Sequence, residues 1–358
     1  MSLDNSLFDN EYSEDKTIKM IDFIDETNDD IDAFDKEAWA KGDGFVFPSY
    51  PIFTEKLEGM DDGLYLFAGL SNHGKSGVLL NLMEDCCSCE KNNAFGLYFS
   101  LDDSKNEIIA RIIAMNELIP IGIVSKPKRY QNKITKADND INYYNENSAA
   151  IESYRTNLEK RKQGLQHLKD KKDSFKVVDS AKINNIEDMY NYIKTIITYL
   201  QSKNINKKLI IGIDSINDIN WGKRITDKED PIAKVSKEVK KWTVEFKCPI
   251  LASCHIRKLN SNRRPVLDDL KDSTVIVYEA SVSFILYNDV SANGNSAKIC
   301  QQRIDSEVKE PIIEMHWAKN KKSSFKGRTF MFFSPDYSKT SECNANDMTR
   351  YSALIYET

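Results

Sequence analysis

From about residue 63 onward, the chain alternates short apolar runs with longer segments in which apolar residues recur at helical spacing. Near-continuous apolar runs are typical of strands that are buried on both faces of a parallel sheet. The predicted strands are residues 64–69, 95–103, 175–180, 207–215, 249–255 and 282–288. Residues 312–319 and 328–334 then predict a late β-hairpin. The pattern therefore predicts an α/β fold with a mostly parallel central sheet flanked by helices.

Residues 121–174 interrupt this alternation, because they are polar and rich in Lys and Asn. Their larger apolar residues fall on a spacing like that of a heptad's a and d positions, broken by Arg161. They are Ile151, Tyr154, Leu158, Leu165 and Leu168. We expect a helix or a helical hairpin inserted into the core fold. Packing on its own domain is favoured over an intermolecular coiled coil, since only about two and a half heptads are present.

Residues 1–50 are expected to form an acidic N-terminal arm. Residues 1–40 hold 13 Asp and Glu against 3 Lys, a net charge of −10, so the remaining 318 residues carry +5. This composition favours a solvated or weakly helical arm, while its apolar residues leave open docking on a neighbouring subunit or a partner protein. Those residues are Ile21, Phe23, Ile24, Ile31, Phe34 and Trp39. The mildly basic remainder permits contact with nucleic acid.

Composition also bears on location. No apolar run approaches the roughly 18–20 residues of a membrane span, and the acidic start lacks the basic and apolar regions of a signal peptide. The seven Cys are scattered without the spacing of a disulfide framework. These features favour a protein of the reducing cytoplasm without a membrane partner.

The stretch GLSNHGKS at residues 69–76 matches the P-loop pattern G-x4-G-K-[ST] in full. It follows a predicted strand and opens a predicted helix, which is the context that the pattern requires. Backbone N–H groups of such a loop surround phosphates, the lysine approaches the β- and γ-phosphates, and the serine hydroxyl can bind Mg²⁺. The sequence therefore predicts a site for ATP, with the nucleotide-binding residues Gly69, Ser71, Asn72, His73, Gly74, Lys75, Ser76 and Gly77.

Two further strands end in carboxylates. Asp214 ends the very apolar run of residues 207–214, where a Walker B carboxylate would join Ser76 in holding Mg²⁺. Aspartate is also a common turn residue, which is the alternative explanation. Asp102 and Asp103 end the strand after the P-loop helix, where a carboxylate could polarise the water that attacks the γ-phosphate. This second position is typical of RecA-like ATPases.

Five stretches together resemble the motor domain of DnaB-type replicative DNA helicases, including phage and plasmid relatives. In order they are GLSNHGKS, YFSLDDSKNEIIARIIA, KKLIIGIDSIND, VSKEVKKWTVEFKCPILASCHIRKLN and RRPVLDDLKDSTVIVYEASVSFILYND. The resemblance covers residues 55–340 except 121–174, and implies a RecA-like P-loop NTPase core. We therefore expect a motor domain at residues 51–345 and a C-terminal tail at 346–358. About 50 residues precede the motor, fewer than a helical collar or a primase domain needs.

The resemblance also implies roles for single residues. Asp102 matches the family's catalytic glutamate, and His255 matches the polar residue that senses the γ-phosphate. Lys319 and Lys321 stand where the family has a K-x-R finger that reaches the neighbouring subunit's ATP. Lysine in place of arginine loses the planar, bidentate contact with phosphate. Further positions implied are Arg328, as a substitute for the finger, and Arg111 and Tyr337, near the adenine base.

Two loops are candidates for contact with DNA. Lys223 and Arg224 follow the Walker B strand. The second group follows His255 and consists of Arg257, Lys258, Arg263 and Arg264. Cations on loops that line a channel would bind the phosphates of a single strand without reading its bases, although ordinary solvated loops have similar composition.

The function implied is an ATP-hydrolysing, ring-forming helicase motor that uses Mg²⁺ and translocates on single-stranded DNA in replication. Its expected partners are further copies of itself in a hexamer and possible primase or helicase-loader proteins, in the cytoplasm of a bacterial cell or a phage-infected host. The alternative is a RecA-like, nucleotide-dependent DNA-binding assembly protein that does not unwind DNA.

Overall fold

The computed structural model describes residues 20–40, 42–222, 230–259, 263–270, 275–302 and 308–356. The chain divides into two compact units, Met1–Gly44 and Phe45–Thr358. In the first unit, helix α1 spans Met20–Ala40. Its residues Ile31, Phe34 and Trp39 are 57%, 72% and 85% exposed. The acidic arm is therefore helical over this stretch, with large apolar side chains on its surface.

The second unit begins a few residues earlier than the boundary expected at residue 50. Phe45, Phe47 and Tyr50 are buried in its core. Phe45 also forms a backbone bridge with Met60, and the Tyr50 hydroxyl donates to the Thr340 carbonyl at 2.9 Å. Aromatic side chains carry a large apolar surface, so burying them ties this segment to the body.

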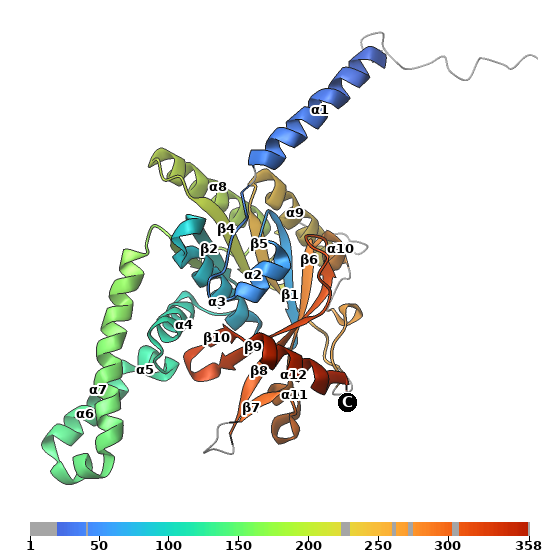
Figure 1. Ribbon diagram of the computed structural model, residues 1–358. Coiled ribbons are helices and arrows are strands. Elements are labelled where there is room, and N and C mark those ends of the chain that lie inside the picture. Colours follow the sequence, from blue (N-terminus) through green and yellow to red (C-terminus); the bar gives the residue numbers. More distant parts are fainter. Residues whose placement is uncertain are drawn as a thin grey trace, which may run out of the picture. The chain divides into compact units, whose positions relative to one another are not determined.

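A ten-stranded sheet forms the centre of the second unit (Figure 1). Its strands are β1 (Gly63–Gly69), β2 (Ala94–Ser100), β3 (Phe175–Asp179), β4 (Lys208–Asp214), β5 (Pro249–His255), β6 (Val282–Asn288), β7 (Cys300–Gln302), β8 (Lys309–Asn320), β9 (Arg328–Ser334) and β10 (Lys339–Glu342). The order is β10-β9-β8-β6-β1-β5-β4-β2-β3, and β7 pairs with β8. Strands β1 to β6 are parallel, whereas β7 to β10 pair antiparallel. The prediction of a mostly parallel sheet with a late hairpin is confirmed.

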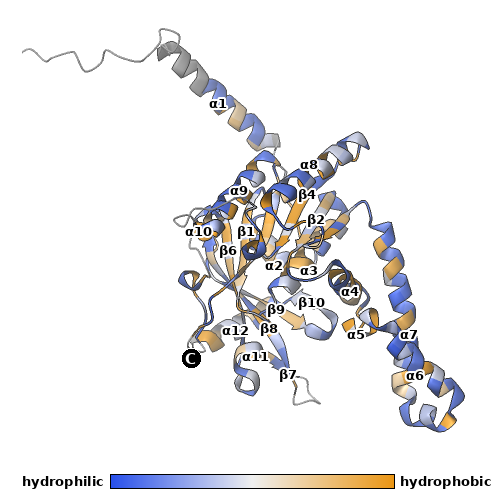
Figure 2. Ribbon diagram, turned by 180° about the vertical axis from the view of Figure 1, so that it is seen from behind, coloured by the Kyte–Doolittle hydropathy of each residue, from blue (hydrophilic) through white to orange (hydrophobic). Residues whose placement is uncertain are grey.

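Helices cover both faces of this sheet. In the described part of the second unit, the helices are α2 (Pro51–Leu57), α3 (Lys75–Ser88), α4 (Lys105–Glu117), α5 (Ile121–Ser125), α6 (Pro127–Asn139), α7 (Ile141–Asp170), α8 (Ile186–Ser202), α9 (Pro231–Glu245), α10 (Val275–Glu279), α11 (Asp289–Asn293) and α12 (Ala345–Tyr356). Alternate residues of β1 enter two different cores. Leu64 and Leu66 pack with Trp242 of α9, whereas Tyr65 and Phe67 pack with Leu79 of α3. Figure 2 shows the central strands as predominantly hydrophobic. No helix in the described part of the chain is long and apolar enough to span a membrane.

The insertion predicted at residues 121–174 consists of α5, α6 and α7. Ile151 of α7 is buried against Ile134 and Ala137 of α6, which makes the two helices a hairpin. Farther along α7, Leu165 and Leu168 pack on the cluster around α4. The apolar spacing of α7 is therefore used within its own domain, as the favoured interpretation held. The hairpin extends away from the sheet in Figure 1.

The segment expected as a C-terminal tail contains a packed helix. Tyr351 of α12 is 1% exposed and lies against Phe330 of β9, with ring centroids 5.6 Å apart. Ile299 and Ile312 complete this small core.

Candidate nucleotide-binding site

The P-loop connects the end of β1 at Gly69 with the first residue of α3, Lys75. Gly74 has a φ of 87°, which disfavours any other residue, and a Cβ there would collide with the Ile313 side chain. A Cβ at Gly69 would approach the Leu286 carbonyl oxygen to 3.1 Å. Both glycines are thus required by close packing against β6 and β8. The loop has the shape of a backbone cradle for phosphates.

Lys75 is 8% exposed, and its Nζ donates to the Leu70 carbonyl at 2.9 Å, across the loop. Burial lowers the pKa of this ammonium, while the carboxylates of Asp214 and Asp102 oppose that shift. The lysine is therefore held by the P-loop and is within electrostatic reach of the two predicted catalytic carboxylates.

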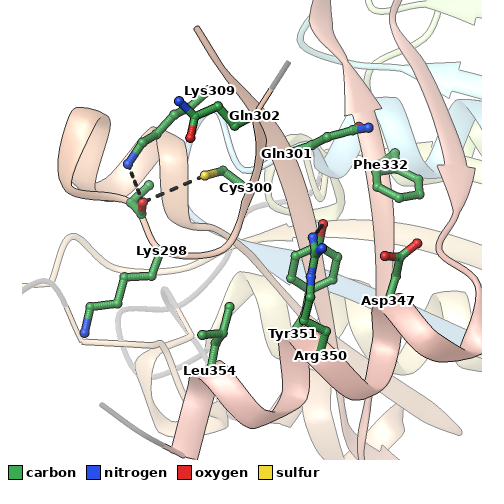
Figure 3. A pocket seen from close by; sticks show the side chains of 11 residues that line it. Lys298, Cys300, Gln301, Gln302, Lys309, Phe332, Asp347, Arg350, Tyr351 and Leu354 are labelled. Carbon is green, nitrogen blue, oxygen red and sulfur yellow. Dashed lines mark hydrogen bonds between the residues drawn. The ribbon is translucent and has the colours of Figure 1, made fainter. Parts of the chain in front are cut away.

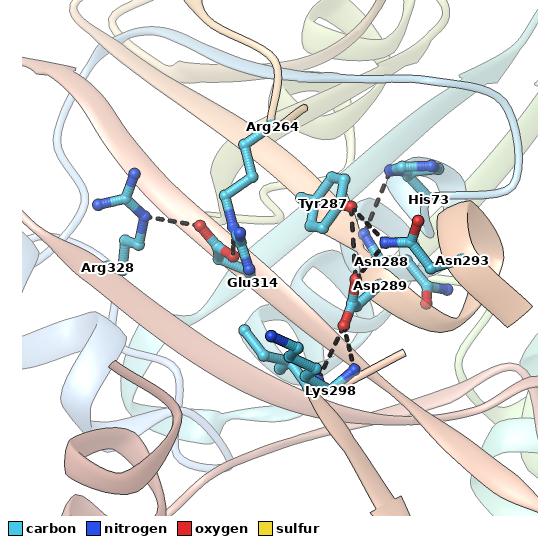
Figure 4. A network of polar contacts seen from close by, with 10 residues as sticks. His73, Arg264, Tyr287, Asn288, Asp289, Asn293, Lys298, Glu314 and Arg328 are labelled. Carbon is cyan, nitrogen blue, oxygen red and sulfur yellow. Dashed lines mark hydrogen bonds and ion pairs between the residues drawn. The ribbon is translucent and has the colours of Figure 1, made fainter. Parts of the chain in front are cut away.

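His73 is a P-loop residue that is held by the neighbouring strand. Its Nδ1 accepts a hydrogen bond from the Asn288 N–H at 3.2 Å, and its ring meets Tyr287 edge-on (Figure 4). Burial and the nearby Lys75 lower the pKa of His73 to about 4. The imidazole is consequently neutral at pH 7, and it fixes the loop to the end of β6.

Asp214 ends β4 and is 5% exposed. Its carboxylate accepts a hydrogen bond from the Tyr98 hydroxyl at 2.9 Å and another from the Ser253 hydroxyl. Burial and the negative charge of Asp214 raise the pKa of Tyr98, so the Tyr98 hydroxyl keeps its proton and remains a donor. Sequence reasoning did not identify Tyr98 and Ser253. The signal for Ser253 was its hydroxyl in an otherwise apolar stretch of β5.

Asp102 and Asp103 follow β2 and have different surroundings. Asp103 is half-buried and accepts from Arg111 at 2.8 Å, whereas Asp102 is exposed. Burial raises the pKa of Asp103, and Arg111 partly offsets this shift. Arg111, expected near the adenine base, thus lies against a carboxylate of the catalytic edge. Tyr337, the other residue expected there, is half-buried in a short turn that α3 holds through a 2.7 Å bond from Asn81 to the Ser338 carbonyl.

His255 ends β5 and contacts the turn that follows β4. Its backbone N–H donates to Asn217 Oδ1 at 2.8 Å. Its Nε2 lies 3.2 Å from Ser215 Oγ and 3.6 Å from Asp218 Oδ2. A displacement of the imidazole would therefore change the position of this turn, which precedes Lys223 and Arg224 in the sequence. Those two cations lie outside the described residues.

The cations after His255 are not equivalent. Arg257 and Lys258 are exposed. Arg263 is bound to both carboxylate oxygens of Asp269, at 2.7 and 2.6 Å. Arg264 is engaged inside the domain, where it donates to Glu314 at 2.7 Å and lies 5.0 Å from the Tyr287 ring centre (Figure 4).

Glu314 also binds Arg328, the expected substitute for the finger. Its carboxylate is 3% exposed and accepts from Arg328 Nε at 2.6 Å. Two arginines thus compensate one buried carboxylate, an arrangement in which removing one partner is costly. Arg328 is therefore committed to its own chain.

Lys319 and Lys321 lie at the edge of the sheet opposite to the P-loop. Lys319 pairs with Ser283 at the start of β6, whereas Gly69 pairs with Leu286 near the end of that strand. The Lys319 ammonium donates to the Val277 carbonyl and, at 3.1 Å, to the Tyr278 carbonyl. Burial and the neighbouring Lys321 lower the pKa of Lys319 to about 8. Lys321 is exposed.

A cavity of about 570 Å³ lies away from these residues, between β7, β9 and α12 (Figure 3). Charged side chains from the loop before β7, from β8 and from α12 line it, namely Lys298, Lys309, Asp347 and Arg350. Lys309 is held there by the Asn295 and Ala297 carbonyls, each at 2.6 Å. No residue of the P-loop lines this cavity.

Comparison with solved structures supports the same fold. One solved ATPase domain superposes with a TM-score of 0.67 at 18% identity, over 88% of this chain and 98% of that one. A DnaB-like replicative helicase, whose structure was described with its interactions with primase, gives a TM-score of 0.64 at 18% identity, over 88% of this chain and 66% of that one.

Sequence comparison identifies the family. The replicative DNA helicase DnaB of Mycoplasma pneumoniae is 24% identical over 248 residues, which are 66% of this chain and 45% of that protein. That of Helicobacter pylori strain J99 is 33% identical over 89 residues, 24% of this chain and 18% of that protein. The chain thus spans less than half the length of these relatives. The family model of the DnaB-like helicase C terminal domain matches residues 49–341. The chain therefore belongs to the DnaB-like helicase C-terminal domain family.

Proposed function

We propose that this chain is an ATP-hydrolysing motor that assembles into a ring and translocates on single-stranded DNA as a replicative helicase. The observation that carries the proposal is the division of the predicted catalytic residues between two edges of one sheet. Lys75, Asp214 and His255 lie at the P-loop edge, and Lys319 and Lys321 lie at the other. A site that needs both groups is complete only between two copies of the chain.

The P-loop edge suits Mg–ATP. Backbone amides of the cradle and Lys75 would bind the phosphates, and Ser76 with Asp214 would hold the metal. A hydroxyl and a carboxylate are ligands that Mg²⁺ prefers, and Tyr98 and Ser253 fix the orientation of that carboxylate. When bound, Mg²⁺ bridges the phosphates and neutralises charge on them.

Asp102 is the residue that would orient and deprotonate the attacking water. It is exposed, whereas Arg111 engages the adjacent Asp103. An aspartate is one methylene shorter than the family's glutamate, so the water must be held closer to the end of β2.

His255 would transmit the state of the γ-phosphate to the DNA-binding loops. Its contacts with Ser215, Asn217 and Asp218 connect it to the turn before Lys223 and Arg224. The chain that continues from His255 carries the exposed Arg257 and Lys258. Contacts between such cationic side chains and the phosphates of DNA bind a single strand irrespective of its bases.

The assembly proposed is a hexameric ring in the cytoplasm, with a primase or a helicase loader as further partner. The exposed apolar residues of α1 support a role for the acidic arm in docking on a neighbouring copy or such a partner. Deleting residues 1–40 would weaken assembly, as measured by light scattering. Unchanged assembly would exclude docking between copies.

The experiment that tests the function is ATPase activity with and without single-stranded DNA, measured beside the mass by light scattering. We expect DNA-stimulated turnover in a hexamer-sized species, followed by unwinding of a forked duplex. DNA-stimulated turnover without unwinding, with every candidate loader added, would favour the assembly protein. A monomer with no response to DNA under the same conditions would contradict both.

A further inference from the structure

The hairpin of α6 and α7 carries a concentration of positive charge that the nucleotide site does not use. Residues 121–174 contain 12 Lys and Arg against 7 Asp and Glu, a net charge of +5. The whole chain after residue 40 also has a net charge of +5, so this insertion accounts for the excess. Five of its cations fall in residues 126–136, and residues 118–137 contain no Asp or Glu.

These five cations are available at the surface. Lys126, Lys128, Arg129 and Lys136 are exposed, and Lys133 is half-buried. None of the five is in an ion pair with a residue that the structure describes. The acid that follows them, Asp138, is itself bound by Arg155.

Helical spacing gathers three of the cations on one stripe of α6. Arg129, Lys133 and Lys136 are at positions i, i+4 and i+7. Tyrosine rings hold two of them: Lys136 lies 4.0 Å from the centre of Tyr143, and Lys133 lies 5.2 Å from that of Tyr154. Such cation–π contacts limit side-chain freedom, so less conformational entropy is lost when an anion binds.

Contacts from α7 fix the hairpin to the rest of the domain. Arg161 donates to the Val124 carbonyl at 2.9 Å, and Lys171 reaches the buried Glu84 of α3 at 2.5 Å. Gly164 lets α7 approach α4, because a Cβ there would lie 2.8 Å from Glu117 Cγ. The basic stripe is thus held at a defined distance from the sheet (Figure 1).

The surface of the hairpin offers few exposed aliphatic side chains to a protein partner. The apolar side chains of the hairpin, among them Ile134 and Ile151, are buried between its two helices. Within the described hairpin, Ile141 at the turn is the large aliphatic side chain that stands exposed, at 67%. Protein interfaces centre on buried apolar or aromatic anchors, whereas binding to a nucleic-acid backbone rests chiefly on cations.

We propose that the α6–α7 hairpin is a second nucleic-acid contact, which binds the phosphate backbone of DNA independently of sequence and apart from the loops after β4 and β5. Residues 126–136 span roughly 15 Å of helix, against one phosphate per roughly 3.4 Å of each DNA strand, so several phosphates can be contacted together. Because the hairpin belongs to the insertion, it suits contact with a DNA strand or a duplex arm that lies outside a central channel.

The test compares two variants of the full chain with matched losses of charge. In the hairpin variant, the four exposed cations Lys126, Lys128, Arg129 and Lys136 are each changed to Gln. In the control variant, four exposed lysines on other elements are changed to Gln, namely Lys176, Lys203, Lys208 and Lys247. Binding of a labelled oligo-dT strand and of a labelled forked duplex is measured between about 50 and 300 mM salt. Over this range the affinity of a protein that contacts phosphates falls steeply with salt concentration.

The hairpin variant is expected to bind at least about tenfold more weakly at low salt, with a shallower slope of log K against log salt. Each lost contact removes roughly 0.7 from the slope on a single strand and roughly 0.9 on a duplex. The control should keep the slope of the unmodified protein. A third variant, with Arg at positions 126, 128 and 136, should retain binding because it retains the charge.

Two outcomes would overturn the proposal. One is equal slopes for the hairpin variant and the unmodified protein. The other is a change in mass by light scattering with unchanged DNA binding, which would assign the stripe to a protein contact, such as the acidic arm of another copy. Basal ATPase without DNA is recorded in parallel. It should be unchanged, so that loss of the hairpin contact is distinguished from failure of the motor.

Discussion

Lys75, Asp214 and His255 lie where the parallel strands end, and each is fixed by a partner from its own chain. Lys319 and Lys321 lie at the other edge, where Lys319 is held by the carbonyls of Val277 and Tyr278. The first edge is organised around a phosphate site, with a cradle, a lysine and two carboxylates. The second presents cations far from that cradle.

This contrast between the two edges would make hydrolysis depend on assembly. Binding of ATP requires only the first edge, so a single copy should bind nucleotide. Hydrolysis gains from a cation that stabilises charge on the transferred phosphoryl group. If that cation comes from the second edge of another copy, binding and turnover separate.

Replacing Lys75 with Ala should abolish the function of the first edge. The lysine supplies the charge next to Asp214 and Asp102, and we expect ATPase turnover to fall by at least about 100-fold. Steady-state phosphate release measures this loss. Lys203→Ala, an exposed lysine of the loop after α8, should leave turnover unchanged. Substantial activity in Lys75→Ala would mean that the cradle is not the nucleotide site.

Changing Asp102 to Asn should separate chemistry from binding. An amide cannot accept the proton of the attacking water, so kcat should fall by about 10²–10⁴-fold. Binding of a fluorescent ATP analogue should remain within a few-fold. Asp103→Asn is the matched control, because Asp103 is engaged by Arg111. A larger loss of kcat in Asp103→Asn than in Asp102→Asn would reverse the two roles.

The second edge should impose a pH dependence. The pKa of Lys319 is lowered to about 8, so its charge is present below that pH and is lost as pH rises through it. If this cation acts on a neighbouring nucleotide, turnover should decline several-fold between about pH 7.5 and 9. Lys319→Arg keeps the charge over this range and should abolish the decline. A decline that persists in Lys319→Arg would assign it to another group.

The smallest effect is expected for Tyr98→Phe. The change removes the 2.9 Å hydrogen bond to Asp214 and leaves the packing of the ring. Loss of such a bond to a charged group costs roughly 1.5–3 kcal/mol, divided between folding and metal binding. We expect the Mg²⁺ concentration that gives half-maximal turnover to rise a few-fold, together with a lower melting temperature. Unchanged values for both would show that Ser253 alone orients the carboxylate.

Much of the fold could be predicted because its signals are local. The parallel strands β1 to β6 are short, largely apolar runs, and the P-loop has a fixed spacing between Gly69 and Lys75. The hairpin of β8 and β9 could also be predicted from the sequence. The acidic arm gave weaker signals, since a polar surface helix such as α1 has little apolar periodicity to detect.

The rest depends on contacts between elements that are distant in sequence. Arg264 was interpreted as a DNA contact and Arg328 as a substitute finger, yet Glu314 of β8 binds both. That cluster exists because β8 lies between β6 and β9, and strand order is not encoded in any one segment. The bond from Tyr98 to Asp214 likewise follows from the neighbouring positions of β2 and β4. Arg111 was expected near the adenine base, and its pairing with Asp103 depends on the geometry of the turn before α4.

The most direct test of the account combines two inactive proteins. Lys75→Ala lacks a working P-loop but retains Lys319 and Lys321, and the double variant Lys319→Ala with Lys321→Ala has the reverse defect. The two are mixed before assembly, and ATPase turnover is measured with single-stranded DNA over a series of ratios. If the site is shared, about a quarter of the interfaces in an equal mixture pair an intact P-loop with intact lysines, and turnover reappears to that extent. Turnover that stays at the level of the separate proteins at every ratio, in assemblies shown by light scattering to be mixed, would contradict a site built from two copies.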